Sequence, residues 1–162
     1  SQAKEIAFFD RGPVDSTKMA SGGSWSVYWY NGSIVSSEIA RGLDILELTP
    51  NAMLSQNEID AAKLVKFDYL NVQDQQKLVW PASFSVARAY LDQLERNGGL
   101  APARISAARN ALTAAEKAPA GVRGTMLGNL ATELHKDATS AKDQARVHTL
   151  ASAVGDLAKA SA

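Results

Sequence analysis

Cysteine is absent from the 162 residues of the sequence, and histidine occurs only twice. The lack of cysteine excludes disulfide bonds, thiolate metal sites and cysteine nucleophiles, although it does not identify a compartment. The motifs HExxH, Walker A, GxGxxG and GxSxG are missing as well, which removes the usual signatures of zinc proteases, nucleotide-binding proteins and serine hydrolases. We predict no catalytic residue, no metal site and no cofactor.

Long apolar runs are also missing. No stretch approaches the roughly 20 apolar residues that a membrane-spanning helix needs, and the first residues lack the basic and apolar regions of a signal peptide. We therefore expect no transmembrane segment and no signal peptide within this chain. With 46% hydrophobic and 21% charged residues, the composition is that of an ordinary globular protein with one domain or two small ones.

Charge of one sign is not concentrated in the chain. The net charge is zero, with 7 basic and 10 acidic residues through Trp80 and 10 basic and 7 acidic residues after it. Lys and Arg form no stripe, so we expect no nucleic-acid partner.

An aromatic, β-branched stretch predicts a three-stranded antiparallel meander. The strands are expected over Trp25–Tyr30, Ser33–Ile39 and Leu43–Leu48. Asn31-Gly32 between the first two strands is a strong hairpin signal, because a type I′ turn needs positive φ at both central residues. Upstream, the short apolar run Lys4–Asp10 predicts a further strand.

A short helix is expected after the meander. Ser55 and Glu58 have the spacing of a capping box, in which each side chain binds the backbone amide of the other residue. This helix should end near Lys63 or Leu64. Residues 65–80 are ambiguous, with strand-like alternation in one part and a polar connection in another.

From Pro81 onward the apolar period changes to about 3.6 and alanine dominates, which predicts about four antiparallel amphipathic helices. The second should open at Pro102, and the fourth near Ser140, with Ser140 and Asp143 as a weaker capping box. The expected inward faces are Phe84, Ala87, Leu91 and Leu94; Ile105, Ala108, Leu112 and Ala115; Val122, Met126, Leu130 and Leu134; and Val147, Leu150, Val154 and Leu157. The predicted fold class is α+β: a meander over residues 1–50, a capped helix and connector over 51–80, and a helical bundle over 81–162.

The aromatic side chains of the first strand are the most prominent candidates for binding. Alternation places Trp25 and Trp29 on one face and Tyr28 and Tyr30 on the other. They suit a surface on which a ligand stacks, but they also suit a sheet core with cross-strand pairs. We favour the core for Trp25 and Trp29 and keep Trp25, Tyr28 and Tyr30 as candidate ligand contacts.

Two further groups of residues have a functional and a structural interpretation. Glu38 and Asp44 could converge as an acid–base pair, but hydrogen bonding of Glu38 and Arg41 within the turn is favoured, and both stay as candidate binding residues. His135 and His148 are expected on different helices. They could form a metal or acid–base pair, but two solvated histidines are favoured because no carboxylate has ligand spacing.

The order of these elements resembles the C-terminal part of bacterial LVIVD-repeat β-propeller proteins. The residues that carry the resemblance are Gly42, Leu43, Ile45, Glu47, Leu48, Thr49 and Pro50, followed by the stretches "NEIDAAK" and "VWPASF". It covers roughly Ala3 to Leu100. Leu46-Glu47 departs from the valine–aspartate of the family, and 162 residues cannot form a whole propeller.

The resemblance implies that Trp25–Leu48 is three strands of a terminal blade and that Lys4–Asp10 belongs to the preceding blade. It also implies an extracytoplasmic location in a bacterium. A blade has four strands, so this one needs a strand from elsewhere. The alternative is a self-contained unit in which the strands pack on the helices.

These observations lead to three functional hypotheses. The first is a non-enzymatic structural or interaction protein, a subunit or C-terminal portion of a larger extracytoplasmic assembly, whose partners are other protein chains. The second is a small-ligand or carbohydrate-binding module that uses Trp25, Tyr28 and Tyr30. The third, least favoured, is a hydrolase with Glu38 and Asp44 as its acid–base pair.

Overall fold

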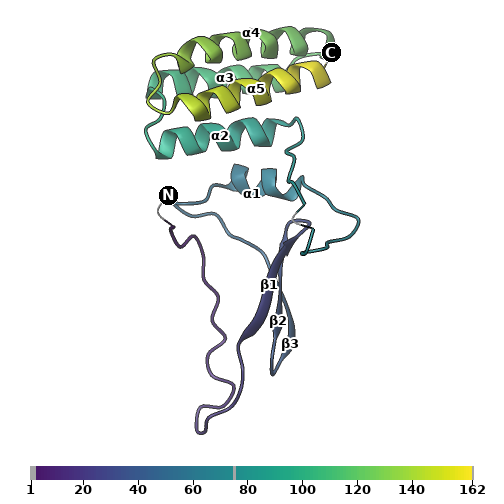
Figure 1. Cartoon of the computed structure of the whole chain (residues 1–162). Helices are drawn as coiled ribbons and strands as arrows, with labels where there is room; N and C mark the ends of the chain where they lie inside the picture. The colour runs from purple at the N-terminus through teal and green to yellow at the C-terminus, as the bar shows by residue number, and fades with distance from the viewer. Residues whose placement is uncertain (1–2, 75, 162) are drawn as a thin grey trace.

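Over its described residues the chain folds into a three-stranded sheet followed by five helices, which confirms the α+β class. The computed structural model describes residues 3–74 and 76–161; Ser1, Gln2, Gln75 and Ala162 lie outside it. Figure 1 shows four roughly parallel helix axes at one end of the molecule, the sheet at the other, and α1 between them. The elements are β1 (Ser24–Tyr30), β2 (Ser33–Glu38), β3 (Gly42–Leu46), α1 (Gln56–Lys63), α2 (Phe84–Arg96), α3 (Pro102–Lys117), α4 (Ala120–Ala138) and α5 (Gln144–Ala160).

The sheet is an antiparallel meander in the order β1-β2-β3. Asn31 and Gly32 have φ values of 52° and 96°, which confirms the predicted turn with positive φ at both positions. The strand register shifts between Ser24 and Ser26, so Trp25 is a bulge residue without a cross-strand partner. The third strand ends at Leu46, two residues earlier than predicted.

The prediction of a strand over Lys4–Asp10 is wrong. Residues 3–23 form an irregular segment that pairs with no strand, and Phe8 is 85% exposed. An apolar run becomes a strand only where a neighbouring strand accepts its backbone hydrogen bonds, and none does so here. Side chains hold this segment instead, with Asn51 Nδ2 donating to the carbonyl of Ile6 at 2.8 Å.

Helix α1 begins and ends as predicted. Ser55 Oγ accepts the amide of Glu58 at 3.2 Å, and the Glu58 carboxylate accepts the amide of Ser55 at 2.7 Å, so the capping box is confirmed. Residues 65–80 contain no strand among those described. This connector is tied to the hairpin turn, because the Asn31 amide group donates to the carbonyl of Phe67 at 2.9 Å and accepts its N–H at 2.7 Å.

Helices α2–α5 form the predicted bundle and contain the main apolar core. The inward faces predicted for α2, α3 and α5 are confirmed, although Phe84 is only partly buried. Val122, predicted to face inward, is exposed. The buried face of α4 includes Leu127, and Val122 lies five positions earlier, a rotation of about 140° from it.

The predicted start of the last helix is also wrong. Helix α5 begins at Gln144, and its N-cap is Asp143, whose Oδ1 accepts the amide of Arg146 at 3.0 Å. Asp143 is held in place from α2, since Asn97 Nδ2 donates to its other oxygen at 2.9 Å. This contact joins the N-cap of α5 to a residue 46 positions earlier in the chain.

Candidate functional site

The large apolar side chains that remain exposed are concentrated in the first half of the chain. Of the 19 exposed large hydrophobic residues in the described part, 18 precede Pro81 and one, Val122, lies in the bundle. The strands contribute five of them: Trp25, Val27, Tyr28, Leu43 and Ile45. A folded monomer normally scatters such residues over its surface, so their concentration points to the meander and its flanking segments.

The register divides the sheet into two faces. The rows Val27–Ser36–Asp44 and Trp29–Ile34–Leu46 lie on one face, which we call the inner face; the rows Tyr28–Val35–Ile45 and Ser26–Ser37–Leu43 lie on the outer face. No apolar side chain in the three strands is fully buried, and their only buried residues are the polar Ser36 and Asp44. The sheet thus has no apolar core of its own.

The inner face is partly covered by the irregular N-terminal segment. Arg11 from this segment binds Asp44 with an Nη2–Oδ1 distance of 2.5 Å, and Asp44 is only 7% exposed. A cavity of about 450 Å³ lies between the segment and the strands; among its lining residues are Arg11, Ser24, Ser36, Glu38 and Asp44. The N-terminal segment therefore contacts the inner face through an ion pair beside a cavity, and not through packed apolar side chains.

Glu38, the last residue of β2, binds backbone amides of the segment before β1 and of the turn that follows β2. Its carboxylate accepts the amides of Gly23 at 2.6 Å and Ala40 at 2.9 Å, and also the amide of Arg41. These hydrogen bonds hold the pKa of Glu38 below its ordinary value, and the bond from Gly23 makes the largest contribution. The predicted structural role of Glu38 in the turn is confirmed.

The proposed acid–base pair is not assembled. Asp44 is paired with Arg11, Glu38 is bound by amides, and no hydrogen bond joins the two carboxylates in the described part of the chain. A carboxylate whose pKa is lowered by amides stays ionised and is poorly suited to act as a general acid. The side chain of Arg41 does not bind Glu38; its Nη2 donates to the carbonyl of Pro13 at 2.8 Å.

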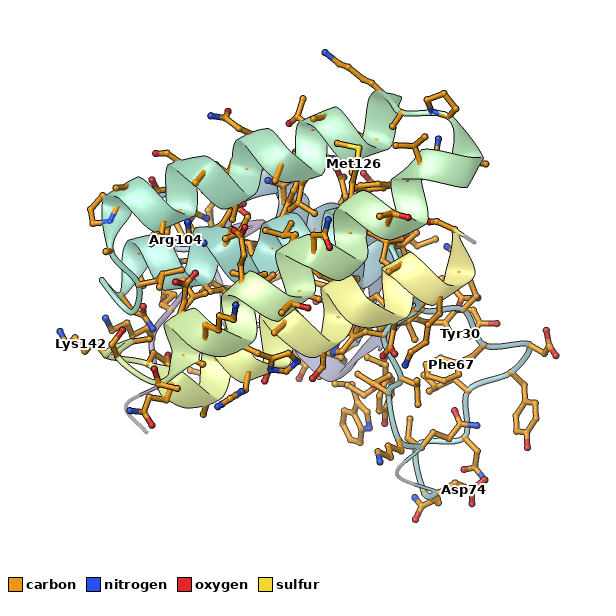
Figure 2. The ribbon with its side chains drawn as sticks, turned by 90° about the horizontal axis from the view of Figure 1, so that it is seen from above. Tyr30, Phe67, Asp74, Arg104, Met126 and Lys142 are labelled. Atoms are coloured by element: carbon orange, nitrogen blue, oxygen red, sulfur yellow. The ribbon has the colours of Figure 1, made fainter. Side chains whose placement is uncertain are left out.

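The three candidate aromatic residues are not brought together as one platform. Trp25, at the bulge, is 79% exposed, so its prediction as sheet core is wrong; Trp29 is half-buried. Tyr28 and Tyr30 lie on the outer face. The Tyr30 hydroxyl donates to the carbonyl of Phe67 at 3.0 Å, so Tyr30 helps to attach the sheet to the connector, and Figure 2 shows these two residues close together.

Sequence reasoning did not single out Val27, Leu43 and Ile45 as surface residues. All three were expected within strands, and strand periodicity alone does not reveal that no layer covers them. The sequence predicts no second sheet, and this could have indicated their exposure. A three-stranded meander without a packing partner leaves its apolar side chains exposed.

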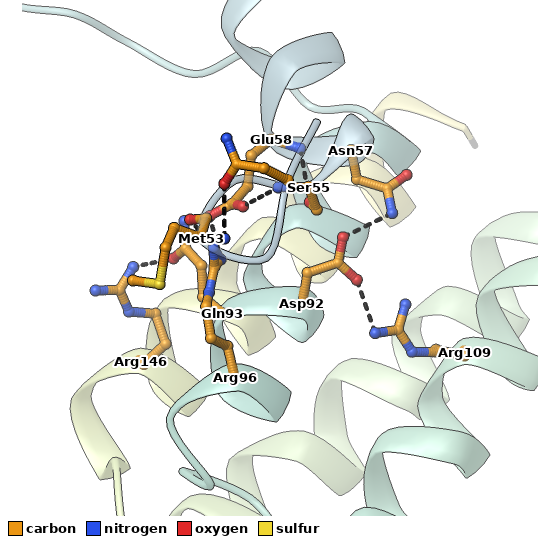
Figure 3. Close-up of polar contacts among 10 residues, drawn as sticks. Met53, Ser55, Asn57, Glu58, Asp92, Gln93, Arg96, Arg109 and Arg146 are labelled. Carbon is orange, nitrogen blue, oxygen red and sulfur yellow. Dashed lines mark hydrogen bonds and ion pairs between the residues drawn. The ribbon is translucent and has the colours of Figure 1, made fainter. Parts of the chain in front are cut away.

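A second cluster of charged groups joins α1 to the bundle (Figure 3). Glu58 of the capping box accepts Gln93 Nε2 at 2.9 Å and Arg96 Nη2 at 2.6 Å, and Arg109 Nη2 lies 2.7 Å from Asp92 Oδ1. Burial raises the pKa of Asp92, but hydrogen bonds from Ser55, Asn57 and Arg109 and the positive charge of Arg109 outweigh it and lower the pKa. Each charge has a partner, which is typical of a structural network.

None of the family models, curated proteins or solved structures compared with the chain matches it. The resemblance to LVIVD-repeat propellers therefore stays a prediction. Within residues 3–74 and 76–161, no helix is long and apolar enough to cross a membrane. Over the same residues, no group of three or more metal-binding side chains is found.

Proposed function

We propose that this chain is an interaction subunit whose meander is completed by another polypeptide. The partner supplies an extended segment that adds a strand to β1 and places apolar side chains on the outer face. The observation that carries this proposal is that, of the 19 exposed large hydrophobic residues in the described part of the chain, 18 precede Pro81 and five of these lie in the strands. Burying this surface against a partner would release apolar area from water, the main favourable term in most protein association.

Strand β1 is the edge that best suits addition of a strand. It forms hydrogen bonds with β2 on one side only, and its sequence, SWSVYWY, contains no charge and no proline. Edge strands are usually protected against pairing by charges, prolines or bulges, and β1 has only the bulge near its start. The other edge, β3, carries the inward-pointing charge of Asp44.

The helices do not supply the missing cover. Helix α1 packs on α2, with Ala61 beside Val86 and Ala89. Polar contacts connect the sheet to the helical part: the Asn31–Phe67 pair, the Tyr30 hydroxyl, and Lys63 with Glu47 at 3.4 Å. This arrangement favours an interpretation in which the bundle is the stable scaffold and the meander is available to a partner.

The finer parts of the proposal follow from the resemblance. A terminal propeller blade lacking its fourth strand would have an open edge of this kind, and membership of that family would place the assembly outside the cytoplasm of a bacterium. The ligand-binding alternative accounts for less of the surface: it uses the exposed Trp25 and Tyr28, whereas the Tyr30 hydroxyl is already bonded to the connector.

The test compares two valine-to-lysine substitutions at similarly exposed positions. Val27 in β1 is 55% exposed and Val122 in α4 is 51% exposed. Without its partner the wild-type chain should self-associate through β1, so light scattering after size exclusion should give a mass that rises with concentration above 17.2 kDa. Val27→Lys should restore the monomer mass, because a lysine on an edge strand opposes pairing.

Val122→Lys is the control and should behave as the wild type. A wild-type chain that is monomeric at every concentration and melts cooperatively would contradict the proposal. An equal effect of both substitutions would contradict it too, because it would assign the association to general surface hydrophobicity.

A further inference from the structure

The two histidines of the chain meet on the surface of the bundle. His135 of α4 and His148 of α5 are both exposed, and their Nδ1 atoms lie 3.4 Å apart. The ring centroids are 5.7 Å apart, with an angle of 41° between the ring planes. The sequence predicted two solvated histidines on different helices; the structure confirms the helices and the exposure and adds the close approach.

The backbone that presents the pair is firmly positioned. Each histidine directly follows a buried core residue, Leu134 in α4 and Val147 in α5. Leu134 and Val147 belong to one apolar cluster, so the packing of α4 on α5 fixes the start of both histidine side chains. Core packing therefore holds the backbone at both histidines and keeps the two exposed side chains within reach of each other.

The nitrogen separation fits coordination of one metal ion. Zn²⁺–imidazole bonds are about 2.0–2.1 Å long, and two such bonds at a tetrahedral angle place the nitrogens about 3.3 Å apart. A neutral histidine with its proton on Nε2 offers the lone pair of Nδ1 to a metal ion. Both rings can therefore bind the ion in this neutral form without releasing a proton.

The nearby carboxylates do not complete a site. Glu133 and Asp137 flank His135 in sequence, but both bind Arg104, at 3.1 and 2.9 Å. The described residues contain no group of three or more possible ligands. Two coordination positions would therefore be filled by water, and binding should be weaker than in a four-ligand structural zinc site.

We propose that His135 and His148 form a two-histidine chelate for a divalent transition-metal ion, with Zn²⁺ as the reference ion. The bound ion bridges the last turn of α4 and the early part of α5. Because it binds the folded chain, in which the two rings are together, it stabilises the bundle.

Calorimetric titration of the intact chain with ZnCl₂ tests the site, together with the melting temperature in about 1 mM ZnCl₂. The wild type should bind one ion per chain, and its melting temperature should rise by about 2 °C or more. His135→Gln and His148→Gln should each abolish both the binding of this Zn²⁺ ion and the rise in melting temperature. Lys136→Gln, a change at the adjacent exposed position, should leave both intact.

Both histidines are exposed, so the glutamine variants are expected to fold, and circular dichroism checks this before titration. The absence of a one-to-one binding event in the wild type would overturn the proposal. It would also be overturned if either histidine variant bound Zn²⁺ as the wild type does, since the ion would then be held elsewhere or by a single ring.

Discussion

Replacement of Leu150 by alanine is expected to lower the free energy of unfolding by about 2–5 kcal/mol. Leu150 lies in α5, is fully buried at 0% exposure and belongs to the main apolar cluster. The substitution removes apolar contacts and leaves a cavity that packed helices fill only in part. Urea denaturation followed by the helical circular dichroism signal measures the loss.

The same substitution in the sheet should have little effect. Leu43 in β3 is 60% exposed, so Leu43→Ala should change the free energy of unfolding by no more than about 0.5 kcal/mol. The comparison keeps the chemical change constant and varies only the burial. A similar loss for both variants would show that the isolated meander has an apolar core, contrary to the present account.

Replacement of Asp92 by asparagine should lower the free energy of unfolding by about 1–3 kcal/mol at pH 7. Asp92 joins three helices: Oδ1 lies 2.7 Å from Arg109 Nη2 of α3, and Oδ2 accepts Asn57 Nδ2 of α1 at 2.8 Å. Asparagine loses the charge and presents only one acceptor oxygen, so one donor loses its bond. Asp156→Asn, at an exposed ion pair with Lys159, is the control and should change stability by less than about 0.5 kcal/mol.

The effect of Asp92→Asn should depend on pH. The pKa of Asp92 lies below its ordinary value of 3.8 in the folded chain, so the unfolded chain takes up this proton first as the pH falls. The stabilisation is complete well above pH 3.8 and is lost as the pH falls from there through the lower folded pKa. Denaturation curves of the two proteins should differ most near neutral pH and converge in acid; a difference that is constant down to strong acid would contradict this role.

Local signals explain why much of the helical half could be predicted. The Ser55–Glu58 capping box is a contact within four residues, and Pro102 opens α3 as expected. The apolar period of α5 identified four of its five buried residues and missed Ala151. The Asn31-Gly32 turn is equally local, because its positive φ values follow from the two residues themselves.

Two of the errors concern contacts that no short stretch contains. Whether Lys4–Asp10 becomes a strand depends on a neighbouring edge, and whether Trp25 is buried depends on a second layer; alternation reveals neither. Asp143, rather than Ser140, caps α5, and its contact with Asn97 comes from 46 residues earlier in the chain. The Arg11–Asp44 pair and the histidine pair likewise join positions that only tertiary packing brings together.

Hydrogen exchange of the intact chain, diluted until light scattering shows the monomer mass, tests the central claim most directly. If the bundle is self-sufficient and the meander needs a partner, amides in α2–α5 should exchange only through global unfolding, and those in β1–β3 about 100-fold or more faster. Mass spectrometry of proteolytic peptides resolves the two regions. Equal protection of β1–β3 and the bundle would show that the sheet is complete without another chain and would contradict the proposed function.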